Sequence, residues 1–281
     1  MDTISVNRMP MQLKQILIRL RRIVGQGLFP YRCCHCDRLY APAADDERDT
    51  PKLLRQLDGF LCMACNRLLD PITAPLCVIC GRPFETDHGV NHVCSRCEST
   101  AYGFEAARSA VTYTSAIRRM VHLYKYEGRS QLARPFGSML WGGLLSHWQP
   151  DQFDLVIPVP LHRKRLRRRG YNQSALLLRH WPEPVNAGPG TAKRFRIMPD
   201  LMVRHRATKP QIGLDVDARR ANMRDAFSIR DPSIIKAKHV LVVDDVLTTG
   251  ATANACARVL KRAGAASVRV LTLARAGQPI V

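Results

Sequence analysis

The chain has 281 residues, which suits one large domain or two small ones with a substantial buried core. Its 43 lysines and arginines exceed its 23 aspartates and glutamates by 20, so the net charge at pH 7 is +20. This excess predicts anionic partners, whether phosphates, nucleic acid or an acidic membrane surface. No apolar run approaches the roughly 18 residues of a membrane span, so we expect a protein without such a span.

Residues 1–30 form the first predicted segment, a basic amphipathic helix or tail. Its apolar face consists of Leu13, Ile16, Leu17, Leu20, Ile23 and Val24. Lysine and arginine occupy several of the remaining positions. Such a helix is expected to pack on its own protein or on a partner, and attachment to anionic lipid is the alternative.

Nine of the ten cysteines lie between Cys33 and Cys97, and eight of them form four Cys-x-x-Cys pairs. Each such turn points two thiolates at one centre, and two turns complete a four-sulfur zinc site. Sequential pairing predicts one site from Cys33, Cys36, Cys62 and Cys65, and another from Cys77, Cys80, Cys94 and Cys97. Interleaved pairing is the alternative, with Cys34, His35, His88 and His92 as spare ligands. Residues 31–100 are therefore expected to form a double zinc ribbon.

Both zinc sites are expected to be structural, because four thiolates leave no open coordination position. The competing interpretation of these cysteines is a disulfide framework, which belongs to exported proteins. The sequence shows no export signal, so we favour zinc and expect a cytoplasmic protein. Cys256 stands apart from the pairs and is expected to be a packed core thiol.

Residues 101–281 are predicted to form an α/β domain, with helices on both faces of a parallel sheet. The expected strands are 109–113, 154–160, 240–245 and 268–274, and the expected helices are 115–125, 131–148 and 253–263. Ligands of such sheets bind at the carboxyl ends of the strands. Two charged segments leave such ends.

The first of these segments follows the strand 240–245, which ends in Asp244 and Asp245. It turns into a helix through Thr248, Thr249, Gly250, Ala251 and Thr252. The positive end of the helix dipole, backbone N–H groups and threonine hydroxyls favour an anion at this turn. The aspartates would repel that anion, so we expect them to contact a neutral polyol such as the hydroxyls of a ribose. An ordinary strand followed by a capped helix is the alternative.

The second segment is a basic run that follows the strand 154–160. Six of the seven residues from Arg163 to Arg169 are lysine or arginine. Such a density repels itself, so a multivalent anion such as pyrophosphate is its natural complement. A solvated surface loop or a nucleic-acid patch is the alternative.

Three further segments are predicted to be irregular. The stretch from Arg204 to Phe227 is expected to be a lid over the site or a loop packed permanently on the sheet. It combines Pro210 and Gly213 with the basic residues Arg206, Lys209, Arg219, Arg220 and Arg224. Residues 41–50 read as an exposed acidic loop. The Pro- and Gly-rich stretch 181–190 is expected to be a surface excursion.

Several motifs together resemble the ComF family, bacterial competence-associated phosphoribosyltransferase homologues. They are Pro158-Val-Pro-Leu-His162, Arg169-Gly-Tyr-Asn-Gln173, Gln211-x-Gly213-Leu214, Arg219-Arg220-x-Asn222, Ala226-Phe227, the Asp244-Asp245 loop, Leu123-x-Lys125-Tyr126-x-Gly128 and the cysteine pairs. The resemblance covers nearly everything from Cys33 to Arg275. It implies a type I phosphoribosyltransferase-like fold preceded by a small double zinc-ribbon domain.

The resemblance also implies roles for individual residues. Asp244 and Asp245 would contact the ribose hydroxyls of phosphoribosyl pyrophosphate as the catalytic pair, and the substrate-binding residues would be Pro160, Leu161, His162, Arg163, Thr248, Thr249, Gly250, Ala251 and Thr252. The residues from 248 to 252 would hold the 5′-phosphate, and those from 160 to 163 would meet the pyrophosphate. Magnesium would bridge substrate oxygens rather than occupy a protein cage.

Two functions from different classes follow. The chain is either a phosphoribosyltransferase-type protein, with an acceptor that the sequence does not identify, or a DNA-uptake adaptor whose pocket senses a nucleotide or sugar phosphate. In the second case, single-stranded DNA and proteins of the competence machinery would be its partners. Aromatic residues make up only 6% of the chain, which weakens a base-stacking mechanism.

Overall fold

A computed structural model describes residues 31–41, 54–86, 88–181, 195–206 and 226–277. The expected helix in residues 1–30 lies outside these ranges. Most of the acidic loop, of the Pro- and Gly-rich stretch and of the segment from Arg204 to Phe227 also lies outside them. In the described part of the chain, no helix combines the length and apolar composition needed to span a bilayer.

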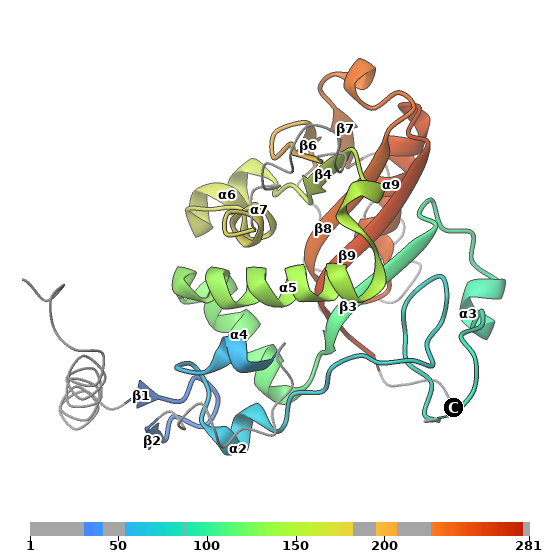
Figure 1. Ribbon diagram of the computed structural model, residues 1–281. Helices are drawn as coiled ribbons and strands as arrows, with labels where there is room; N and C mark the ends of the chain where they lie inside the picture. Colours follow the sequence, from blue (N-terminus) through green and yellow to red (C-terminus); the bar gives the residue numbers. More distant parts are fainter. Residues whose placement is uncertain (1–30, 42–53, 87, 182–194, 207–225, 278–281) are drawn as a thin grey trace, which may run out of the picture.

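The centre of the structure is a parallel sheet of five strands (Figure 1). In spatial order these are β3 (Ala106–Thr112), β9 (Ser267–Arg275), β8 (His239–Leu247), β4 (Leu155–Pro158) and β5 (Arg196–Ile197). The central strand β8 pairs with both neighbours, so that Val242 lies between Val270 and Ile157. The predicted parallel α/β fold is confirmed, and β8 extends two residues beyond its predicted end.

Helices cover both faces of the sheet, and the strand residues alternate between two cores. One core joins Leu241 and Val243 to the helices α4 (Ser115–Tyr126), α5 (Ala133–His147) and α7 (Gln173–Leu178). The other joins Val240 and Val242 to α9 (Ala251–Arg262). All four residues are fully buried, each worth about 1.5–3 kcal/mol of hydrophobic stabilisation. Burial on both faces explains why this strand reads as a continuous apolar run.

The basic run from Arg163 to Arg169 is a helix, α6, rather than a loop. His162 begins it, because the Nδ1 of this side chain accepts a hydrogen bond from the Lys164 amide at 3.2 Å. Gly170 ends it with a φ of 84°, which glycine adopts without strain. The remaining short elements are the antiparallel pair β6 (Met202–Arg204) and β7 (Phe227–Ile229) and the 3-10 turns η4 (Ser130–Leu132), η5 (Pro150–Gln152) and η6 (Pro232–Ile234).

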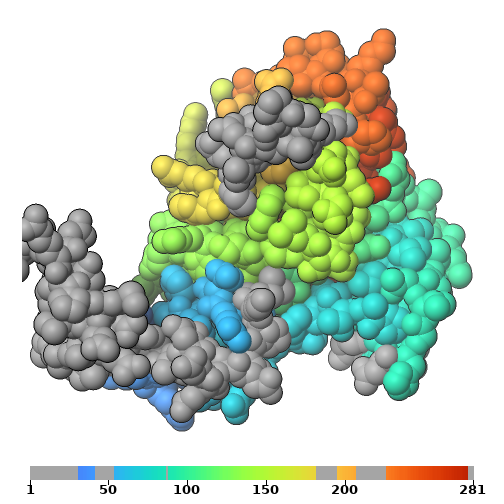
Figure 2. Space-filling model, viewed as in Figure 1, coloured from blue at the N-terminus to red at the C-terminus, as the bar shows by residue number. Residues whose placement is uncertain are grey.

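The cysteine-rich residues form two small units along one side of the sheet domain (Figure 2). Their short elements are the antiparallel pair β1 (Tyr31–Arg32) and β2 (Leu39–Tyr40), η3 (Leu54–Leu57), α2 (Met63–Asn66) and α3 (Ser95–Glu98). The first unit packs through η3 against α5. The chain then runs along β3, where Thr112 donates to the Asp70 carbonyl at 2.8 Å and Ala107 donates to the Ile79 carbonyl at 2.7 Å.

Candidate functional site

The carboxyl end of β8 opens into a cavity of about 530 Å³, called here the main cavity. Its floor is formed by Asp244 and Asp245, and its sides are formed by α4, α6 and the start of α9. Thr248, Gly250, Ala251 and Thr252 line it, and so does Leu161. Cavities at this end of a parallel sheet are where ligands of such folds bind.

The two aspartates reach different partners because side chains alternate along a strand. The Asp244 Oδ1 accepts a hydrogen bond from the Ser174 hydroxyl of α7 at 2.7 Å and one from the Asp245 amide at 2.9 Å. The Asp245 Oδ1 lies 2.7 Å from the Lys125 Nζ of α4. The Asp245 Oδ2 is buried and has no hydrogen-bond partner among the residues that the structure describes. An acceptor of this kind is costly unless a ligand satisfies it.

The electrostatics of the pair follow from this geometry. Burial, and then the neighbouring Asp245 carboxylate, raise the pKa of Asp244 from 3.8 to about 7, while Lys125 and the Ser174 hydrogen bond act in the opposite direction. Burial acts to lower the pKa of Lys125, but the attraction of the adjacent Asp245 carboxylate outweighs it, so the net shift is upward. The ammonium of Lys125 is therefore retained inside the cavity.

Loop 248–252 has the backbone of an anion-binding turn. Gly250 begins α9 with a φ of 82°, a left-handed conformation in which a side chain would be strained. The twelve-residue helix that follows directs its positive end at the main cavity. Thr249 does not line the cavity, and its carbonyl instead accepts a hydrogen bond from the Tyr102 hydroxyl at 3.4 Å.

The cationic side of the main cavity comes from α6 and β6. Arg165, Arg168 and Arg169 line it together with Arg204. Residues 160–163 were expected to meet the pyrophosphate, and of these only Leu161 lines this cavity. His162 and Arg163 line a neighbouring basic cavity of about 590 Å³, to which Arg204 also contributes. Pro160 lines neither cavity.

Sequence reasoning missed two residues that hold the aspartates. Lys125 belongs to a motif of the family, and no sequence pattern marks Ser174. Lys125 lies near the end of α4 and precedes Asp244 by 119 residues in the chain, so no local pattern links them. The signal that could have found Lys125 is its place near the end of an amphipathic helix, where a buried lysine requires a carboxylate partner.

The eight paired cysteines form two groups of four, called here the first tetrad and the second tetrad. The first contains Cys33, Cys36, Cys62 and Cys65, and the second contains Cys77, Cys80, Cys94 and Cys97. Within each group the sulfur atoms all lie within 4.8 Å of one another. The structure therefore adopts the sequential pairing and not the interleaved alternative.

Both tetrads could hold a zinc ion. The Cys36 and Cys62 sulfurs are 3.8 Å apart, and the Cys80 and Cys94 sulfurs are 3.9 Å apart. Four sulfurs around one ion at about 2.3 Å are separated by about 3.8 Å in a tetrahedron, so the spacing fits. In the second tetrad, the pKa of Cys77 is lowered to about 4. A hydrogen bond with the Cys80 thiol is the main cause, burial acts against it, and hydrogen bonds from backbone amides add to it. A thiolate is the form that binds metal.

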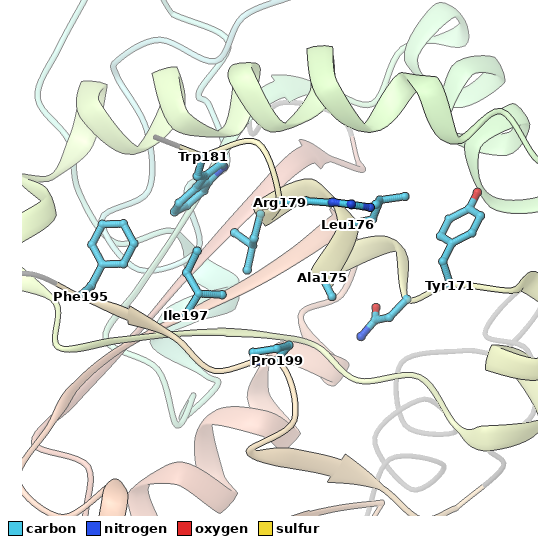
Figure 3. Close-up of a pocket in the computed structure, with 10 residues that line it drawn as sticks. Tyr171, Ala175, Leu176, Arg179, Trp181, Phe195, Ile197 and Pro199 are labelled. Atoms are coloured by element: carbon cyan, nitrogen blue, oxygen red, sulfur yellow. The ribbon is translucent and has the colours of Figure 1, made fainter. Parts of the chain in front are cut away.

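A third, apolar cavity of about 590 Å³ is lined by residues of α7, of the segments that flank it and of β5 (Figure 3). Trp181, Phe195 and Ile197 face it from one side and Tyr171 from the other. Of the described residues that line it, Arg179 is the one that carries a charge. This composition suits an apolar group and does not suit a phosphate.

Comparison with known proteins agrees with an anion-binding site at the end of β8. A family model described as a phosphoribosyl transferase domain matches residues 202–280, which include β8, loop 248–252 and α9. The sheet domain is thus of the phosphoribosyltransferase type.

The relatives identify the family. The chain is 32% identical over 221 residues to DNA utilization protein YhgH of Salmonella typhi, covering 76% of this chain and 90% of that protein. It is 27% identical over 257 residues to competence protein F of Haemophilus influenzae, covering 89% and 99%, and 26% identical over 258 residues to competence protein ComFC of Bacillus subtilis, covering 89% and 98%. The chain belongs to the ComF family.

One solved structure also matches, entitled "Structure of the allosteric regulatory enzyme of purine biosynthesis". The match has 18% identity and a TM-score of 0.31. It covers 54% of this chain and 29% of that chain.

Proposed function

We propose that the main cavity binds phosphoribosyl pyrophosphate with magnesium and that the protein acts as a phosphoribosyltransferase. The observation that carries this proposal is the buried Asp245 Oδ2, an acceptor to which no described residue donates, on the floor of a cavity lined by several cationic side chains. A ribose hydroxyl is a neutral donor that would satisfy it. A second hydroxyl would reach Asp244, which already accepts from Ser174.

The rest of the ligand would then be distributed by charge. The 5′-phosphate would lie against loop 248–252 and the start of α9, where amides, hydroxyls and the helix dipole favour an anion. The pyrophosphate would face Arg165, Arg168 and Arg169. This differs from the initial expectation, because α6 turns His162 and Arg163 toward the basic cavity.

The reaction that we propose joins an acceptor atom to C1 of the ribose and releases pyrophosphate. Asp244 and Asp245 would stabilise positive charge that develops on the sugar, and the arginines of α6 would stabilise the departing anion. Magnesium would supply charge neutralisation on the pyrophosphate oxygens. Residues 31–100 would form a zinc-ribbon unit with zinc in both tetrads, and residues 101–281 would form the transferase domain.

Titration calorimetry with phosphoribosyl pyrophosphate and magnesium tests the pocket. The double variant Asp244→Asn/Asp245→Asn is expected to weaken binding at least tenfold. Asp151→Asn is the matched control, because the same change falls on an exposed residue of η5. Equal affinity in the double variant and the wild type would refute the assignment. A screen of bases and amines for pyrophosphate release would then test transferase activity and identify the acceptor.

A second candidate function is DNA binding, which the surface of α6 favours. Arg163, Lys164 and Arg167 are exposed, and the Arg169 guanidinium lies 5.1 Å from the centre of the exposed Tyr126 ring. A cationic ridge beside an exposed ring suits a single-stranded backbone. Fluorescence anisotropy across a salt series, wild type against Lys164→Ser/Arg167→Ser, tests this function. A salt slope that the substitutions leave unchanged would exclude α6 as the contact.

A further inference from the structure

The second tetrad lies against loop 248–252 through the turn that follows it. The Tyr102 ring packs on the tetrad and stacks on Phe104 with ring centres 4.7 Å apart. Its hydroxyl donates to the Thr249 carbonyl, and the next residue, Gly103, donates its amide to the Asn254 Oδ1 at 2.7 Å. One short turn therefore contacts both the loop and the first turn of α9.

The contact is close enough to restrict the loop. A Cβ placed on Gly250 would lie 3.2 Å from the Tyr102 Cε1, so the ring rests directly against the glycine that begins α9. Because proteins pack at near-crystalline density, a shift of Tyr102 would be transmitted to this residue.

Arg275 forms a second link between the tetrad and the loop. It ends β9 and is 3% exposed. One guanidinium nitrogen donates to the Leu247 carbonyl at 3.1 Å and to the Thr248 carbonyl. Burial lowers the pKa of the Arg275 guanidinium, and the nearby Cys80 sulfur, as a negative charge, acts in the opposite direction. A zinc site with four thiolates is negatively charged overall, so the buried cation is held between that charge and the two loop carbonyls.

We propose that the second tetrad, when loaded with zinc, acts through Arg275 and Tyr102 as a positioning element that holds loop 248–252 in its ligand-binding conformation. Arg275 and Tyr102 are positioning residues and touch no ligand. The first tetrad packs on η3 and α5 instead and has a separate role. The inference rests on the proposed function for the identity of the ligand, but the state of the loop can be measured without it.

Amide hydrogen exchange on the full-length zinc-loaded protein tests the link directly. In Arg275→Gln, the amides of residues 247–254 are expected to exchange at least tenfold faster than in the wild type. Arg108→Gln is the matched control, because Arg108 belongs to β3 and donates to the Val78 carbonyl of the same unit at 3.0 Å and to the Ala107 carbonyl at 2.8 Å, not to the loop. Arg275→Lys keeps the charge beside Cys80 and is expected to restore part of the protection.

Metal loading is tested by a second pair of variants. Cys97→Ser is expected to remove one zinc per chain and to speed exchange in residues 247–254. Cys36→Ser is expected to remove one zinc as well and to leave that segment protected. The proposal would be overturned if the amides of residues 247–254 exchanged at the wild-type rate in both Arg275→Gln and Cys97→Ser. Two independent variants are used so that a folding defect in one of them does not decide the test.

The consequence for binding separates this proposal from the proposed function. Calorimetry of Arg275→Gln with phosphoribosyl pyrophosphate and magnesium is expected to show a dissociation constant raised at least tenfold, about 1.4 kcal/mol, with unchanged zinc content. A wild type that binds no phosphoribosyl pyrophosphate refutes the proposed function, while the exchange data still decide the positioning role. A wild type that binds, together with equal affinity in Arg275→Gln, refutes the positioning role alone.

Discussion

The ion pair between Lys125 and Asp245 offers the sharpest test of the cavity floor. Its atoms are 2.7 Å apart, and the side chains are 18% and 5% exposed, so it behaves as a buried pair. Removal of one partner from such a pair costs about 3–5 kcal/mol, because a charge stays buried without compensation. Lys125→Met keeps the apolar stem and should lower the free energy of unfolding by about that amount. Lys125→Met/Asp245→Asn removes both charges and should recover most of it.

Urea titration followed by tryptophan fluorescence measures this effect, since Trp141, Trp148 and Trp181 all lie in the sheet domain. Arg119→Met is the control, because it breaks the ion pair between Arg119 of α4 and Glu127, which follows that helix. The paired atoms are 2.8 Å apart, but the two side chains are 42% and 41% exposed. Surface pairs of this kind contribute about 0.2–1 kcal/mol. A Lys125→Met variant that is no less stable than Arg119→Met would refute the reasoning, and so would a double variant no more stable than Lys125→Met.

Three further outcomes are expected. The folded-state pKa of Asp244, about 7, exceeds its unfolded value of 3.8, so ionisation of this group destabilises the fold and its contribution declines between about pH 4 and pH 7. Urea midpoints of the wild type should therefore fall over this range relative to Asp244→Asn, and parallel curves would contradict the assignment. Treatment of the protein with a thiol-binding mercurial should release two zinc ions per chain, and a metal analysis that finds none would exclude the ribbon interpretation. Gly250→Ala should cost about 1–2 kcal/mol because of its positive φ and should weaken sugar-phosphate binding, and calorimetry showing wild-type affinity would place the anion elsewhere.

Local patterns were sufficient for much of the fold. The spacing of the cysteines predicted both tetrads, and the apolar run before Asp244 predicted the central strand, because both depend on short-range chemistry. The position of His162 and Arg163 could not be predicted in the same way. Once the basic run is a helix, the residues at helical spacing, Arg165, Arg168 and Arg169, share one face and reach the main cavity.

The partners of the aspartates lay beyond sequence reasoning for a different reason. Lys125 and Ser174 approach β8 from two separate helices, and only the tertiary packing of α4 and α7 on one face of the sheet brings them there. The same holds for Arg275, which reads as the end of a strand and acts on a loop that precedes it by more than twenty residues.

The path of residues 70–79 along β3 has a bearing on how the protein can be divided. β3 is the outermost strand of the sheet on its side, and the carbonyls of Asp70 and Ile79 occupy two of its outward amides. A fragment that began near residue 101 would leave this row of amides and carbonyls open to pairing with another molecule, the usual route to aggregation of exposed strands. Self-association of such a fragment would then reflect a bare strand rather than a natural oligomer.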